Sequence, residues 1–147
     1  MGKIQLYTIG FTKKSAEEFF DKLKQVKIKR VIDIRLHNTS QLAGFTKQAD
    51  LSYFLKKVVG KIDYQHILEL APTTEILKEY RQSGEWSIYE KKFTQLMQER
   101  KIAAKFSPQF LHQACLLCSE AKPTYCHRRL VAEYLQNQWQ ELEIKHL

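Results

Sequence analysis

Residues 3–35 read KIQLYTIGFTKKSAEEFFDKLKQVKIKRVIDIR, and the fold prediction starts from this stretch. Two β-favouring runs, 3–10 and 30–35, flank a segment whose apolar side chains recur at helical spacing. Ser15 and Glu18 stand where a capping box would start that helix. A strand, a helix and a nearly continuous apolar strand are typical of a right-handed crossover. We therefore predict that the two strands form a parallel pair.

The same alternation continues to the end of the chain. Further helices are predicted at 49–59, 75–82, 87–101 and 128–138, and further strands at 61–67, within 110–118 and at 142–147. In the helix at 87–101 we expect inward-facing Ile88, Phe93, Leu96 and Met97. This order predicts a three-layer α/β/α fold, Rossmann-like in general architecture, with a mostly parallel sheet of about five strands. No repeat or linker divides the chain, so we expect a single domain over residues 1–147.

Length and composition exclude several classes of protein. The chain has 147 residues, 44% hydrophobic and 27% charged, which is typical of an ordinary soluble globular protein. No apolar run approaches the roughly 20 residues that span a bilayer. A β-like run begins near residue 3, which does not fit a signal peptide. We expect a cytoplasmic protein without membrane contact, while its oligomeric state stays open.

The net charge of +8 concerns partners rather than fold. It favours an anionic small molecule or a nucleic acid as partner. The lysines are spread through the chain and form no basic arm, so a generally basic solvated surface is the alternative.

Three cysteines, Cys115, Cys118 and Cys126, lie within twelve residues of one another. An odd number in a chain of this class argues against a disulfide framework. Metal binding, thiol reactivity and plain burial stay open as their roles.

The densest set of reactive residue types is LLCSEAKPTYCHRR at 116–129. Cys126 precedes a predicted helix, whose positive end favours a thiolate, and His127, Arg128 and Arg129 follow it. We interpret Cys126 as a nucleophile or redox thiol with His127 as acid or base; a buried packing cysteine is the alternative.

Cys118 ends an apolar strand, and Glu120 follows it as a second acid/base candidate or as the partner that orients His127. Cys115, Cys118, Cys126 and His127 also resemble a zinc set. A strand sends the side chains of Cys115 and Cys118 to opposite faces, however, and structural zinc pairs normally lie on tight turns. We therefore expect no metal and no cofactor.

Other predicted strand ends carry polar groups that would meet at one edge of the sheet. Asp33 and Arg35 share a face, either as a salt bridge or with Arg35 as an anion clamp. Thr8 and Gly10 precede a helix, where backbone can approach an anionic ligand closely. Weaker candidates lie in neighbouring loops: His37, His66 and Glu69.

Several ordered motifs between Leu6 and Leu135 resemble the Domain of Unknown Function 488 family. These motifs are Thr8-Ile9-Gly10, Asp33-Ile34-Arg35, the spacing of Tyr89, Phe93 and Met97, and Cys118-Ser119-Glu120 with Pro123-Thr124-Tyr125-Cys126-His127-Arg128. The chain departs from the family pattern at Phe11-Thr12, where His-Ser is common, near Asn38, where a proline is common, and at Leu70-Ala71-Pro72, where L-G-G is common. The missing histidine weakens a mechanism with a base in the first loop, and the changed loops suggest a different substrate or a divergent subgroup. The family lacks an established activity, so the resemblance supports the fold and the site more than a function.

The sequence therefore yields one leading hypothesis and two rivals. The leading one is a thiol-dependent enzyme of unknown reaction that acts on a phosphate-bearing or nucleic-acid-derived substrate. Its catalytic candidates are Cys126, His127, Glu120 and Cys118, and its substrate-binding candidates are Arg35, Arg128, Asp33, Thr8 and Gly10. The rivals are a non-catalytic nucleic-acid-binding module and a metal-stabilised interaction domain.

Overall fold

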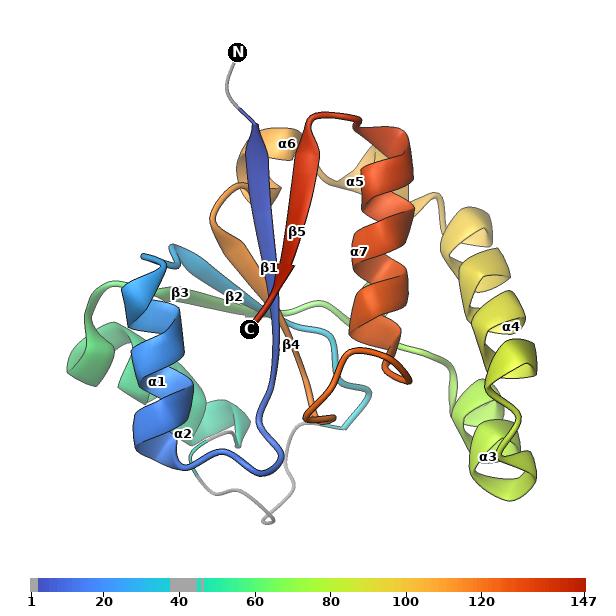
Figure 1. The fold of residues 1–147 in the computed structure, drawn as a ribbon, viewed down its shortest axis with the longest axis horizontal. Helices are drawn as coiled ribbons and strands as arrows, with labels where there is room; N and C mark the ends of the chain where they lie inside the picture. Colours follow the sequence, from blue (N-terminus) through green and yellow to red (C-terminus); the bar gives the residue numbers. More distant parts are fainter. Residues whose placement is uncertain (1–2, 38–44, 46) are drawn as a thin grey trace.

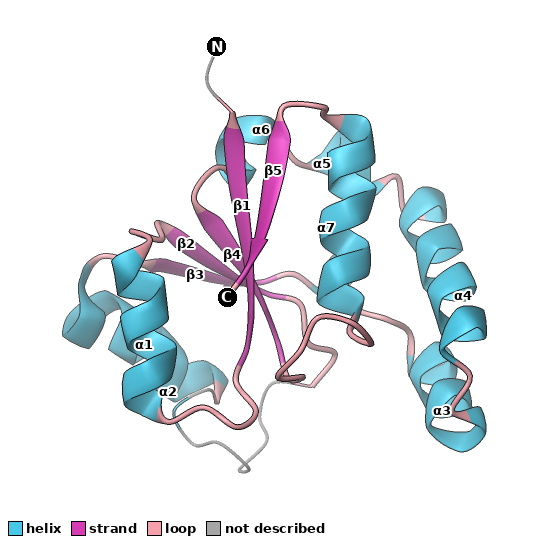
Figure 2. Cartoon of the chain, viewed as in Figure 1, coloured by secondary structure: helices cyan, strands magenta, loops and turns pink. Residues whose placement is uncertain are grey.

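A computed structural model describes residues 3–37, 45 and 47–147 of the chain. Within them, five strands form one sheet in the order β3-β2-β4-β1-β5, and every neighbouring pair is parallel. Helices cover both faces of this sheet (Figures 1 and 2). The predicted three-layer α/β architecture with a parallel sheet is confirmed.

The elements alternate along the chain, with the longest helices in its second half. In order they are β1 Ile4–Gly10, α1 Ala16–Gln25, β2 Arg30–Asp33, α2 Gln48–Tyr53, the π-helix η2 Phe54–Gly60, β3 Asp63–His66, the 3₁₀ helix η3 Leu68–Leu70, α3 Thr74–Ser83, α4 Trp86–Glu99, α5 Ile102–Lys105, α6 Pro108–Leu111, β4 Ala114–Cys118, α7 His127–Gln138 and β5 Leu142–His146.

Each face of the sheet has its own apolar core. On one face, Phe19 and Leu23 of α1 and Leu51 of α2 pack against the strands. On the other face α7 lies directly on the sheet, with the α3–α4 pair outside it (Figure 1). The Ser15–Glu18 capping box at the start of α1 is present as predicted. Burial of these two cores is the main force that stabilises the three layers.

The predicted pairing of the first two strands is wrong. β4 lies between β1 and β2, and it pairs with both of them. The crossover through α1 therefore passes over one strand position. Local periodicity gives no information about this, because a later segment of the chain inserts between two earlier strands.

Several element boundaries also differ from the prediction. The helix predicted at 49–59 changes to a π-helix at Phe54. The strand predicted within 110–118 is present as β4, and the short helix α6 precedes it. In α4, Ile88 was predicted to face inward, but it is 37% exposed, and the neighbouring Tyr89 is buried instead. The loop predicted at 36–47 lies largely outside the described residues.

The strand order creates a topological switch point between β2 and β4. From β2 the chain crosses to β3 at one edge of the sheet, while from β4 it crosses over β1 to β5 at the other edge. Ligand crevices of open parallel sheets form where neighbouring connections diverge in this way, beyond the carboxyl ends of the strands. Arg35 follows β2 and Cys118 ends β4, so both lie at this point.

Candidate functional site

A pocket of about 250 Å³ opens at the switch point. It is enclosed by the segments after β2 and β4, the loop before α7, and the α3–α4 pair. Its walls are formed by Arg35, Leu36, His37, Pro72, Leu77, Tyr80, Arg81, Trp86, Tyr89, Cys118, Ser119, Glu120, Tyr125, Cys126 and His127. Five residues of the predicted site line it together: Arg35, Cys118, Glu120, Cys126 and His127.

Cys118 lies at the carboxyl end of β4 and is 5% exposed. Its Sγ is 3.5 Å from Nδ1 of His127. A hydrogen bond from the Cys126 thiol lowers the pKa of Cys118 below its ordinary value, although burial alone would raise it. The backbone N–H of Ser119 and that of Glu120 act in the same direction, because they donate to the sulfur.

Cys126 is the N-cap residue of α7, as the sequence suggested, but its thiol stays protonated. Donation to Cys118 raises the pKa of Cys126, and burial adds to this effect. The helix N-terminus and the His127 imidazole would each lower the pKa of Cys126, but the hydrogen bond to Cys118 and burial outweigh them. Of the two thiols, Cys118 is therefore the one that the surroundings favour as thiolate.

His127, the first residue of α7, joins the two sulfurs to the backbone after β2. Its Nε2 lies 2.8 Å from the carbonyl oxygen of Ile34. A carbonyl oxygen only accepts, so Nε2 must carry the proton that it donates there. Nδ1, the other ring nitrogen, is turned toward Cys118. Phe93 packs against the imidazole with 5.4 Å between ring centres and fixes its orientation.

Asp33 and Arg35 form a buried ion pair at the end of β2. The guanidinium donates from Nε and Nη2 to the two carboxylate oxygens at 2.9 and 2.8 Å, and the Tyr64 hydroxyl donates to Asp33 at 2.6 Å. Burial would lower the pKa of Arg35, but the hydrogen bonds and charge of Asp33 raise it. Asp33 is fully buried and is absent from the pocket wall, so it anchors Arg35 while Arg35 reaches the pocket.

Arg128 is fully buried and is not part of the pocket wall. Its Nε donates to the Thr8 hydroxyl at 3.2 Å, and its Nη1 donates to the carbonyl oxygen of Glu120. The Thr8 hydroxyl is also 2.6 Å from Nδ1 of His146. These bonds tie the loop after β4 to β1 and β5. Arg128 and Thr8, predicted to bind substrate, therefore lie beneath the loop that carries the site.

A comparison with family models gives a match over most of the chain. The model described as "Domain of unknown function DUF488" matches residues 15–135. The chain belongs to this family. No match was found among curated proteins or among solved structures. Membership of DUF488 confirms the resemblance stated from the motifs, but it assigns no reaction.

In this DUF488 chain, Gly10 lies in close contact with the loop after β4. A Cβ atom at this position would overlap the backbone carbonyl of Glu120 and meet the Arg128 guanidinium. The absence of a side chain lets the loop after β4 lie directly on the end of β1. The Glu120 side chain itself is exposed and lines the pocket.

Three of the four residues of the possible zinc set come together. Ligand atoms of Cys118, Cys126 and His127 lie within 4.8 Å of one another, and they form a group that could hold a metal ion. Two thiols and an imidazole with an open fourth position are a donor set that zinc accepts. Cys115 packs in the core on the opposite face, as the alternation of the strand predicts, and burial raises its pKa.

The weaker candidates are dispersed. His37 lines the pocket, whereas Nε2 of His66 lies 2.7 Å from the backbone oxygen of Arg35 and supports the segment after β2. Glu69 is exposed and is not part of the pocket wall. Among the described residues, no helix is both long and apolar enough to cross a membrane.

Sequence reasoning missed the aromatic side of the pocket. Tyr80, Trp86, Tyr89 and Tyr125 come from α3, α4 and the loop before α7. The only signal in the sequence was the helical spacing of Tyr89 with Phe93 and Met97, which indicates a buried helix face and does not indicate a binding wall.

Proposed function

We propose that this DUF488 protein is a thiol-dependent enzyme whose nucleophile is Cys118, with His127 as its proton acceptor, acting on an anionic, phosphate-bearing substrate. The observation that carries the proposal is the position of the Cys118 sulfur. It lies in the pocket wall, 3.5 Å from an imidazole nitrogen that is turned toward it. A nucleophile and a base in hydrogen-bond reach, with the base oriented by a third group, is the general arrangement of covalent catalysis.

The reaction begins with the proton of Cys118 passing to His127. The thiolate is stabilised by donation from Cys126. The sulfur then forms a bond to an electrophilic carbon or phosphorus atom of the substrate while the bond to the leaving group breaks. The leaving group departs with its electron pair and takes the proton from His127. Water hydrolyses the covalent intermediate, placing hydroxide on the substrate atom and a proton back on the thiol.

Two arginine side chains that line the pocket support an anionic substrate. Arg35 is held in place by Asp33, and Arg81 stands exposed at the rim. Guanidinium groups bind phosphate through planar, paired donors. Glu120, the exposed acid of the pocket, is positioned for proton exchange with a leaving group or with water.

Alkylation with iodoacetamide tests the nucleophile. At neutral pH we expect Cys118 to be labelled much faster than Cys126, and Cys115 to be labelled slowest, as read by peptide mass spectrometry. The His127→Gln variant should slow Cys118 labelling at least tenfold, in line with the usual contribution of a general base. Equally slow labelling of all three cysteines would remove the basis of the proposal.

Treatment with a chelator separates this function from a metal centre. We expect Cys118 to react at the same rate before and after treatment with EDTA, because no metal is needed to hold the thiolate. Stoichiometric zinc in the purified protein, with alkylation that becomes fast only after chelation, would contradict the proposal and favour the metal-stabilised domain.

A further inference from the structure

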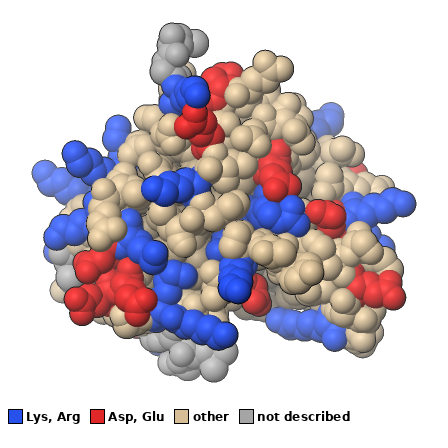
Figure 3. All heavy atoms as spheres, viewed as in Figure 1, with Lys and Arg blue, Asp and Glu red and all other residues tan. Residues whose placement is uncertain are grey.

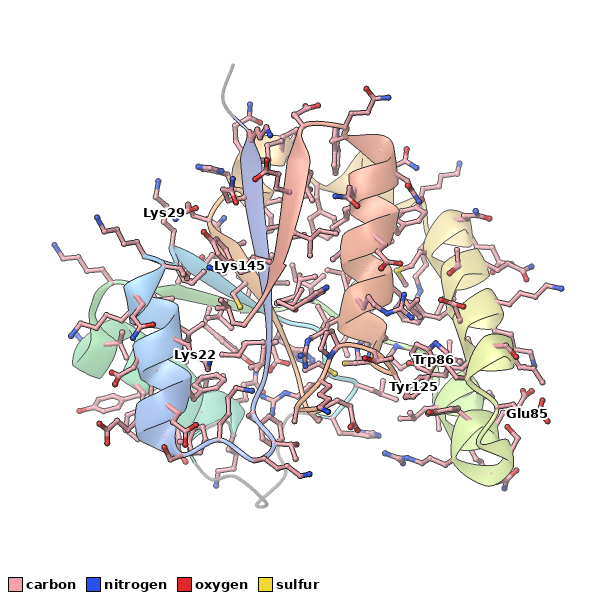
Figure 4. All side chains as sticks on the ribbon, viewed as in Figure 1. Lys22, Lys29, Glu85, Trp86, Tyr125 and Lys145 are labelled. Carbon is pink, nitrogen blue, oxygen red and sulfur yellow. The ribbon has the colours of Figure 1, made fainter. Side chains whose placement is uncertain are left out.

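Aromatic side chains make up one wall of the pocket. Trp86 and Tyr89 stack with 5.0 Å between ring centres and 22° between planes, and Tyr80 packs against both. Tyr125 approaches Trp86 edge-on at 5.6 Å from the loop before α7. Figure 4 shows Trp86 and Tyr125 pointing toward each other between α4 and α7. The wall therefore joins two segments far apart in the sequence.

Two features of this wall are unusual for rings that serve only as core. A ring that served only as core would be buried, but Tyr125 is 62% exposed where it lines the pocket. Tyr89 is 4% exposed and lines the pocket. Burial together with the nearby Cys118 and Cys126 sulfurs raises the pKa of Tyr89, so the hydroxyl remains a donor next to the two thiols. A hydroxyl donor in the wall of a pocket can meet an acceptor of a ligand.

Cationic groups flank the rings. Arg81 lines the pocket, is exposed, and has no ion-pair partner among the described residues. Arg35 also lines this cavity. The guanidinium of Arg129 lies 6.0 Å from the Trp86 ring, on the outer side of the wall. Planar rings and guanidinium groups in one small cavity suit a ligand that combines a flat aromatic ring with an anion.

We propose that the pocket binds a nucleoside monophosphate. The base lies against Trp86 and Tyr125, the Tyr89 hydroxyl donates a hydrogen bond to the ligand, and the phosphate interacts with Arg35 and Arg81. Base stacking on aromatic side chains tolerates any base, because every base has a π face. The inference rests on the proposed function, since it names the substrate class of that same pocket. The cavity size favours a mononucleotide over a polymer.

The two tryptophans of the chain, Trp86 and Trp139, provide the assay. In the Trp139→Phe variant only Trp86 emits, so its fluorescence reports on the aromatic wall. We expect AMP, GMP, CMP or UMP to quench this emission with saturation, and ribose 5-phosphate to bind at least tenfold more weakly because it lacks a ring. Equal binding of ribose 5-phosphate, or no binding of any nucleotide, would overturn the inference. Tighter binding of phenyl phosphate than of every nucleotide would also overturn it and indicate a phosphotyrosine-like ligand.

Two variants test the parts of the pocket separately. Tyr125→Ala should weaken nucleotide binding about tenfold, as expected for one lost stacking contact. Tyr53→Ala is the matched control, because Tyr53 is 58% exposed on α2 and is not part of the pocket wall, and this variant should bind normally. Arg81→Gln should weaken the binding of nucleotides but leave that of the uncharged nucleosides unchanged. Equal losses in the Tyr125 and Tyr53 variants would contradict a specific wall.

Protection of Cys118 from iodoacetamide distinguishes the two proposals. We expect a saturating nucleotide to slow the labelling of Cys118 and to leave Cys115 unaffected. Fast labelling of Cys118 with no nucleotide bound would reject the substrate class while the thiol function stands. Nucleotide binding to a protein whose Cys118 reacts as slowly as Cys115 would reject the thiol function while the ligand class stands.

Discussion

At the scale of single residues, the central feature is one hydrogen bond between two thiols. Cys126 donates to Cys118, and this bond is the largest influence on the pKa of either group. We therefore expect Cys126→Ala to raise the pKa of Cys118, and Cys126→Ser, which keeps a donor, to raise it less. The pH dependence of the alkylation rate, measured in a Cys115→Ala background, gives both values. Identical profiles for the two variants would show that the hydrogen bond does not control the thiolate.

The third cysteine predicts how stability changes with pH. Burial raises the pKa of Cys115 in the folded state above its ordinary value of 9.0. Above pH 9 the unfolded chain therefore loses this proton while the folded protein keeps it, so the folded state becomes less stable as pH rises. We expect Cys115→Ala to remove about 1 kcal/mol of the stability loss between pH 8 and pH 10, measured by urea unfolding at each pH. The same pH dependence in both proteins would contradict a buried, protonated thiol.

The residues of the candidate site could be located from the sequence better than the contacts among them. Cys118, Cys126 and His127 could be found because a strand end and a helix start bring them to one edge of the sheet. Which thiol donates to the other depends on side-chain placement in three dimensions, and helix-dipole reasoning selected Cys126. The burial of Arg128 could not be predicted, because its partners, among them Thr8, come from distant segments.

At the scale of elements, the site depends on how the loop after β4 lies on the end of β1. Gly10 leaves no room for a Cβ beside the Glu120 carbonyl, and Arg128 bonds to that same carbonyl. We expect Gly10→Ala to destabilise the protein by about 2 kcal/mol or more in urea unfolding, because backbone rather than a flexible side chain must move. Displacement of the loop should also slow the alkylation of Cys118.

A glycine at a helix end provides the control for this prediction. Gly84 is the C-cap of α3 with φ of 69°, and the space around it is open. Asn adopts this left-handed conformation at helix ends, so Gly84→Asn should cost less than about 1 kcal/mol. A loss in Gly10→Ala no larger than that in Gly84→Asn would contradict a destabilising contact between a Cβ at position 10 and the Glu120 carbonyl.

Elements were predicted well wherever a local pattern defined them. The capping box at Ser15 and the strand at β5 follow from neighbouring residues alone. Strand order does not, because the place of β4 between β1 and β2 is decided by which faces bury the most apolar surface after the whole chain has folded. The aromatic wall could not be predicted for the same reason, because it forms only when α4 packs beside α7.

At the scale of the whole molecule, the net charge of +8 is the feature that favours the alternative of a nucleic-acid-binding module. On the face drawn in Figure 3, Lys and Arg are distributed across the surface with Asp and Glu between them. Charge arranged in this way gives weak, non-specific attraction to polyanions, which falls steeply with salt because many counterions are released. Binding of a ligand with a single phosphate releases few counterions, so its affinity depends much less on salt.

The salt dependence of binding therefore separates the two functions. Between about 50 and 200 mM salt, we expect the affinity for a nucleoside monophosphate to fall about threefold and that for a single-stranded 20-mer to fall by orders of magnitude. Tyr125→Ala should weaken only the former, because Tyr125 lies at the pocket mouth whereas the polymer would bind the dispersed lysines and arginines. Tight 20-mer binding at about 200 mM salt that is lost in Tyr125→Ala would put the nucleic acid itself in the pocket. In that case the pocket would be a recognition site for a nucleic-acid strand, and the pH-dependent reactivity of Cys118 would decide whether it also performs chemistry.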